Sequence, residues 1–282
     1  MALRGIRPAV LAAGVPCQGF SRSNRKRHDD DERNQLFLDF MRLAKAIRPR
    51  AVVIENVSSL RGVAGGGFEN AIRNEIESTL GLRAYVVTLD AADFGVPQHR
   101  SRVFFIGIPK SRVWDEPTPS HGPGRQYPYR TVRDAIYDLP RLRAGQSTPY
   151  YSNSSLSEYA ELLKGSQKHL LNHQAPAHPA GTIQRIRATK PGEPMYPNFR
   201  QRIRLHWDRP SPTQVSGGIR AQFQFGHPSQ ARGLSIRERC RIQSFPDWME
   251  VCGGLVQGRI QTGNAVPPLL AQAVAHSILR SL

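Results

Sequence analysis

The sequence has few cysteines and few acidic residues, and it has no long apolar run. Its 282 residues include three cysteines, Cys17, Cys240 and Cys252, which lie far apart and form no Cys-x-x-Cys pair. This pattern argues against a disulfide framework and against a metal site of the zinc type. No apolar stretch approaches the roughly 20 residues of a membrane span, and the opening MALRGIRPAVLAAG is too short for a signal peptide. We therefore expect a protein of a reducing cytoplasm with no membrane partner and no metal.

The shortage of acids leaves a large positive charge. Lysine and arginine number 39 against 22 acids, which gives a net charge of +17. Such an excess favours a polyanionic partner, with nucleic acid as the leading candidate. A basic surface that serves only solubility is the alternative, and composition alone does not decide between them. With 39% hydrophobic residues, the chain can bury a real core in one large or two small domains.

Short apolar runs alternate with helical periodicity in the first hundred residues. We expect strands at 9–13, 51–55, 83–90 and 102–108, and helices at 34–47 and 68–80. This alternation predicts an α/β fold with a parallel doubly wound sheet, in which ligands bind beyond the carboxyl ends of the strands. Cys17 follows the first strand and Glu55 ends the second, so both are expected at that edge.

The rest of the chain has weaker signals. Residues 111–130 are rich in proline and glycine and indicate a linker or surface loop. Short capped helices are expected within 131–140 and 234–247, and a final helix begins near Pro267. Residues 144–200 show little periodicity and are interpreted as the start of a small second domain.

Three local patterns could carry chemistry. Cationic and polar side chains follow Cys17, and such neighbours can lower the pKa of a thiol, although a structural thiol beside a basic loop would look the same. Glu55 at a strand end is a candidate proton donor, or else a solvated acid. If the next strand starts within QHRSR, Arg100 and Arg102 share one face and suit a phosphate or a base edge, unless they form a surface charge ladder.

Taken together and in order, six segments resemble the C5-cytosine-specific DNA methyltransferase family. They are GVPCQGFS (14–21), ENV (55–57), QHRSR (98–102), RPSPTQVSGG (209–218), GLSIRERCRIQSFPD (233–247) and GNAVPPLLAQAVA (263–275). The resemblance implies a Rossmann-like class I methyltransferase sheet with a small irregular target-recognition domain. It divides the chain into a catalytic domain (1–110), a linker and target-recognition region (111–208), and a C-terminal segment (209–282) whose last helix returns to the catalytic domain.

By the same resemblance, the thiolate of Cys17 attacks carbon 6 of a cytosine and so activates carbon 5, which takes a methyl group from S-adenosylmethionine. Protonated Glu55 would hydrogen-bond ring nitrogen 3, and Arg102 would contact the cytosine carbonyl oxygen. Arg100 would hold a loop or a phosphate.

The implied partner is double-stranded DNA, from which the target base must be flipped; methyltransferases are among the standard examples of base flipping. The DNA contacts expected in the loop after Cys17 come from Gln18, Ser21, Arg22, Ser23 and Arg25. The family further implies a restriction-modification or orphan modification enzyme in a bacterial-type cytoplasm, associated with the nucleoid through DNA.

The given sequence departs from the family pattern in one respect: it contains no Phe-x-Gly-x-Gly loop for the cofactor. We therefore expect an N-terminally truncated sheet, weak S-adenosylmethionine binding, and cofactor contacts from Pro16, Leu36 and Asn264. A start site placed too far downstream, a split enzyme completed by a separate N-terminal polypeptide, and a decayed gene stay open as explanations.

Two alternative functions stay open as well. The chain could be an inactive or split-enzyme fragment that binds DNA without catalysis. It could also be an RNA cytosine-5 methyltransferase, although the Cys-Phe-Thr signature of the transfer-RNA branch is absent.

Overall fold

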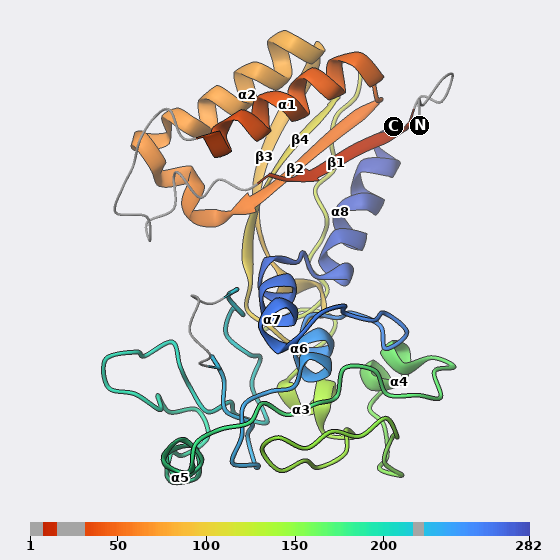
Figure 1. Cartoon of the computed structure of the whole chain (residues 1–282). Coiled ribbons are helices and arrows are strands. Elements are labelled where there is room, and N and C mark those ends of the chain that lie inside the picture. The colour runs from red at the N-terminus through yellow and green to blue at the C-terminus, as the bar shows by residue number, and fades with distance from the viewer. Residues whose placement is uncertain (1–7, 16–31, 217–222) are drawn as a thin grey trace. The chain divides into compact units, whose positions relative to one another are not determined.

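The computed structural model describes residues 8–15, 32–216 and 223–282, which fall into two compact units (Figure 1). Described residues up to Asp90, together with Ser101–Thr118 and Gln272–Leu282, form unit 1. Ala91–Arg100 and the described residues of Pro119–Ala271 form unit 2. No helix in these described ranges is long and apolar enough to cross a membrane.

Unit 1 is built on a four-stranded sheet with the order β1-β2-β4-β3. The strands are β1 (Val10–Gly14), β2 (Ala51–Val57), β3 (Leu82–Asp90) and β4 (Ser101–Pro109), close to the predicted ranges. β1 and β2 pair in parallel, whereas β4 is antiparallel to both β2 and β3. The α/β prediction is thus confirmed, but the parallel prediction is wrong for β4. The link from β3 to β4 spans only residues 91–100, too few for the helical crossover that returns a chain to a parallel strand.

Helices α1 (Glu32–Ile47) and α2 (Gly67–Leu80) lie on the same side of this sheet (Figure 1). Their apolar stripes, which include Phe40 of α1 and Ile76 of α2, pack against Ile54 of β2 and Phe105 of β4. The approach is close at Gly107, where an added Cβ would lie 2.7 Å from the Ile76 side chain. Gly81 ends α2 with a φ of 67°, a left-handed cap that glycine adopts without strain. The packing of α1 and α2 therefore fixes β2 and β4, whose ends carry Glu55 and Arg102.

The C-terminal helix α8 (Pro268–Arg280) contributes its later residues to unit 1. Trp114, which follows β4, donates from its indole Nε1 to the Ser277 hydroxyl at 3.0 Å, and Arg50 donates to the carbonyl of Leu282. Two further segments of the chain are thereby tied to the end of α8.

Unit 2 holds short helices between long connections: α3 (Val132–Ile136), α4 (Glu158–Lys164), α5 (Ala180–Ala188), α6 (Ile236–Ile242) and α7 (Leu255–Asn264). The predicted caps of α3 and α6 are confirmed, because Thr131 with Asp134 and Ser235 with Glu238 each form a capping box. α4, α5 and α7 lie in segments for which the sequence predicted no helix. They are short, and their apolar residues are too few to give a periodic signal.

Buried ion pairs hold unit 2 together around α6, all seven of whose residues are buried. Arg241 lies between Asp138 and Asp247, with a nitrogen to oxygen distance of 2.7 Å to each. Arg232 makes two hydrogen bonds to Glu238, at 2.8 and 2.6 Å. Arg241 and Arg232 thus each have an opposite charge beside them, which is the condition under which such burial is tolerated.

A neutral histidine lies beside these pairs. The Nδ1 atom of His227 accepts hydrogen bonds from the backbone N–H groups of Ser229 and Gln230, at 3.2 and 3.1 Å. Burial lowers the pKa of this imidazole to about 3, and the positive charge of Arg232 acts in the same direction. Burial also lowers the pKa of His173.

Acidification should therefore destabilise the fold before the carboxylates titrate. In the unfolded chain these histidines gain a proton below about pH 6.5, whereas in the folded state they stay neutral to lower pH. Each histidine therefore lowers the free energy of unfolding by up to about 1.4 kcal/mol for each pH unit below that value. We expect the free energy of unfolding, measured by urea denaturation, to be constant above pH 7 and to fall between pH 6.5 and 5. His227→Asn, which keeps an acceptor near Nδ1, should reduce that slope; equal slopes in the variant and the wild type would contradict this account.

Candidate active site

The carboxyl ends of β1 and β2 meet at one edge of the sheet. Their parallel register places Gly14 opposite Glu55, and a Cβ added at Gly14 would lie 3.5 Å from Glu55 Oε2. Beside it, Asn56 donates from Nδ2 to the carbonyl oxygen of Val15 at 2.9 Å. The chain leaving β1 is thus tied at Val15, two residues before Cys17 in the sequence.

Glu55 forms an ion pair with Arg102 across the β2–β4 ladder. The distance from Arg102 Nε to Glu55 Oε1 is 2.8 Å, and the two side chains are 10% and 14% exposed. Val57, two residues after Glu55, lies opposite Arg102 in the register, so the contact runs diagonally between neighbouring strands. Arg102 Nη1 also donates to the carbonyl of Ser101 at 2.8 Å. The guanidinium is held from both sides.

Burial lowers the pKa of Arg102 from its ordinary value, and the Glu55 carboxylate partly offsets this by favouring the charged form. An arginine still carries its charge at neutral pH. The edge therefore offers a fixed donor beside a carboxyl group, both partly shielded from water. The guanidinium can donate to one acceptor of a planar polar group, and the carboxyl group can donate to an adjacent acceptor when it is protonated.

Arg100 has different surroundings. Its fully buried side chain donates from Nη1 to the carbonyl of Gln214 and from Nη2 to those of Gly263 and Ala265, at 2.7, 2.7 and 2.8 Å. Arg100 lies one residue before β4, which begins at Ser101, so the two arginines do not both belong to the strand and the interpretation that they share one of its faces is not confirmed. The contacts of Arg100 are those of a residue that holds a loop, here the turn on both sides of Asn264.

A buried polar network supports the same turn, and sequence reasoning missed it. Gln214 donates from Nε2 to the carbonyl of Arg239 at 3.0 Å, and Arg239 Nε donates to the hydroxyl of Thr262 at 2.9 Å. Gln243 donates to the carbonyl of Thr262. Burial lowers the pKa of Arg239 to about 10, and the charge of Arg259 lowers it further. A run such as RERCR has the composition of a solvated helix, so no sequence pattern signals its burial.

The remaining predicted site residues are distributed as follows. Leu36 lies on α1 with 44% of its surface exposed, and Asn264 is an exposed residue at the end of α7. The others lie outside the described residues: Pro16, Cys17, Gln18, Ser21, Arg22, Ser23 and Arg25. The structure thus brings Glu55 and Arg102 together, and it joins Arg100 to the Asn264 turn.

Comparison with known proteins gives consistent matches. The family model for C-5 cytosine-specific DNA methylase matches residues 4–280. The type II methyltransferase M1.HphI of Haemophilus parahaemolyticus is 36% identical over 96% of this chain and 68% of its own length. The type II methyltransferase M.AgeI of Thalassovita gelatinovora is 32% identical over 95% of this chain and 82% of its own.

Solved structures show the same fold. A prophage-encoded DNA modification methyltransferase of E. coli superposes with a TM-score of 0.77 at 24% identity, covering 98% of this chain and 80% of the other. The Dnmt2 methyltransferase of S. pombe gives a TM-score of 0.54 at 15% identity, covering 96% and 78%.

Removing the Arg100 guanidinium should destabilise the protein. In Arg100→Met, three backbone carbonyls lose a buried donor, and we expect the free energy of unfolding to fall by about 3 kcal/mol. The ammonium group in Arg100→Lys can reach fewer of the three carbonyls, so the free energy of unfolding of this variant should lie between those of Arg100→Met and the wild type. Chemical denaturation measures both, and a loss below about 0.5 kcal/mol in Arg100→Met would show that these contacts do not hold the turn.

Proposed function

The chain belongs to the C-5 cytosine-specific DNA methylase family, and we propose that it methylates carbon 5 of cytosine in double-stranded DNA. The observation that carries the proposal is the Glu55–Arg102 pair, fixed at the strand edge from which the chain leads to Cys17. The names of the similar type II methyltransferases support a role in restriction-modification. The net charge of +17 suits a DNA partner.

In this proposal Cys17 is the nucleophile. Carbon 5 of cytosine is a poor nucleophile until a thiolate adds to carbon 6 and turns the ring into an enamine. Loss of the carbon 5 proton then expels the Cys17 thiolate and restores the aromatic ring. A base stacked in a duplex hides carbon 6, so the cytosine must leave the helix at a cost of a few kcal/mol. The DNA contacts proposed for that step come from residues that follow Cys17 in the sequence: Gln18, Ser21, Arg22, Ser23 and Arg25.

Glu55 and Arg102 bind the edge of the flipped ring. Adding the thiolate to carbon 6 places negative charge on ring nitrogen 3 and on the neighbouring carbonyl oxygen. A protonated Glu55 donates to nitrogen 3, and the Arg102 guanidinium donates to the oxygen. Ring nitrogen 3 and the carbonyl oxygen are adjacent on the ring, and Glu55 and Arg102 are adjacent in the protein, with 2.8 Å between Glu55 Oε1 and Arg102 Nε. The two acceptors thus match the two side chains.

S-adenosylmethionine, when bound, supplies the methyl group. The described residues offer it an exposed apolar side chain from Leu36 and, separately, an exposed amide from Asn264 beside a turn that Arg100 holds. The apolar side chain of Leu36 suits an apolar part of such a ligand, and the amide of Asn264 suits a polar part. Pro16, Leu36 and Asn264 are the proposed cofactor contacts of this chain.

Attack by Cys17 can be measured without a methyl donor. Addition of the thiolate to carbon 6 lets carbon 5 take a proton from water, and reversal can then release the original hydrogen. DNA tritiated at carbon 5 of cytosine should lose tritium to water in the presence of the protein. We expect Cys17→Ser to abolish the release and Glu55→Gln to slow it about 100-fold or more, since a positioned acid contributes about 10²–10⁴-fold.

The same assay separates the alternatives. Release from duplex DNA but not from RNA supports the proposal, and the reverse preference would make the protein an RNA enzyme. A folded protein that binds DNA and releases no tritium would be a DNA-binding protein without catalysis.

Arg102 should act through both its charge and its shape. We expect Arg102→Met to slow tritium release about 10²–10³-fold, the range for loss of one oxyanion donor. Arg102→Lys keeps the charge but loses the guanidinium fork, so it should recover only part of that loss. The comparison is made at saturating DNA, and a full rate in Arg102→Met would remove Arg102 from the mechanism.

A further inference from the structure

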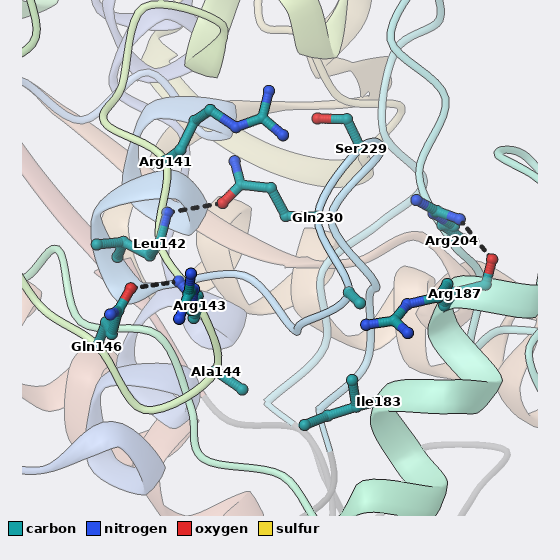
Figure 2. A pocket seen from close by; sticks show the side chains of 11 residues that line it. Arg141, Leu142, Arg143, Ala144, Gln146, Ile183, Arg187, Arg204, Ser229 and Gln230 are labelled. Atoms are coloured by element: carbon teal, nitrogen blue, oxygen red, sulfur yellow. Dashed lines mark hydrogen bonds between the residues drawn. The ribbon is translucent and has the colours of Figure 1, made fainter.

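Unit 2 contains a cavity of about 670 Å³ that the sequence analysis did not predict. Figure 2 shows its lining: Arg141 and Arg143 come from the connection after α3, and Arg187 from the last turn of α5. Every lining residue is described by the structure, and none of them is acidic.

Three of the arginines that line the cavity have guanidinium groups that are not paired with other groups of the described residues. Arg141, Arg143 and Arg187 are exposed, and within the described part of the chain none of their guanidinium groups makes a hydrogen bond or ion pair. Arg204 differs, because its Nη1 donates to the carbonyls of Ile186, Arg187 and Thr189. Arg204 therefore fixes the α5 side of the cavity, while the other three can bind a ligand.

The side-chain oxygens of Gln146 and Gln230 in the lining already accept hydrogen bonds from the protein. Gln146 Oε1 accepts from the backbone N–H of Arg143 at 2.7 Å. Gln230 Oε1 accepts from the N–H of Leu142 at 2.8 Å (Figure 2). It also accepts from Arg232 Nε at 3.0 Å. With these acceptors already used, the cavity presents mainly donors and positive charge, which is the chemistry of an anion site.

We propose that this cavity binds phosphate groups of the DNA backbone, so that it sets affinity and register and does not read the bases. The inference rests on the proposed function. Reading a guanine edge needs an arginine fork held in one orientation, whereas a phosphate accepts donors from many directions. Arg141, Arg143 and Arg187 have no carboxylate partner in the lining to fix their forks, and they are exposed. Phosphate contact is the role that such side chains fit.

The test is the salt dependence of binding to duplex DNA. Each phosphate contact contributes about 0.9 to the slope of the logarithm of the binding constant against the logarithm of salt concentration. We expect R141A/R143A/R187A to flatten that slope by about 2 to 3, and R141Q/R143Q/R187Q to do the same. The ranking of DNA sequences by rate of tritium release should not change.

A matched control removes the same charge elsewhere. Arg73, Arg125 and Lys168 are exposed and do not line the cavity, so R73A/R125A/K168A should flatten the slope by less than 1. Circular dichroism establishes that each variant is folded.

Three outcomes would overturn the inference: an unchanged slope in both cavity variants, an equal flattening in the control, or a changed sequence preference at constant slope. In each of these, wild-type tritium release leaves the proposed function standing. A wild type that neither binds DNA nor releases tritium would overturn both.

Discussion

The ion pair between Glu55 and Arg102 is the interaction on which the site depends. It joins the carboxyl end of β2 to β4, and the parallel pairing of β1 with β2 places Gly14 against the same carboxylate. α1 and α2 pack on both β2 and β4, so their packing fixes the geometry of the pair. An acid and a guanidinium held side by side, with partial shielding from water, can stabilise negative charge that develops on a ring bound against them.

Much of the fold could be predicted from the sequence because its elements have strong periodic or capping signals. β2 and β4 are apolar runs of strand length, and α2 has a four-residue apolar repeat ending at Gly81. The direction of β4 could not be predicted from its composition, since it follows from the short link of residues 91–100. α4, α5 and α7 were missed because each is at most ten residues long and has too few apolar residues for a periodic signal.

The site divides in the same way. Glu55 and Arg102 could be selected as candidates because both stand in short motifs at predicted strands, and the sheet brings the two side chains together. The role of Arg100 depends on carbonyls more than 100 residues away, which no local pattern reveals. The arginines of the unit 2 cavity are likewise gathered from segments that are separate in the sequence. Charge counts indicated an anionic partner, but only the fold shows where the donors converge.

The central claim is that Glu55 and Arg102 bind the ring that Cys17 attacks. The most direct measurement is a crystal structure of the covalent complex with duplex DNA carrying 5-fluorocytosine, in which the fluorine at carbon 5 blocks release of the thiolate. We predict a bond from Cys17 Sγ to carbon 6, with the Glu55 carboxyl on ring nitrogen 3 and the Arg102 guanidinium on the carbonyl oxygen. A ring bound away from the Glu55–Arg102 pair, or joined to a residue other than Cys17, would contradict the account.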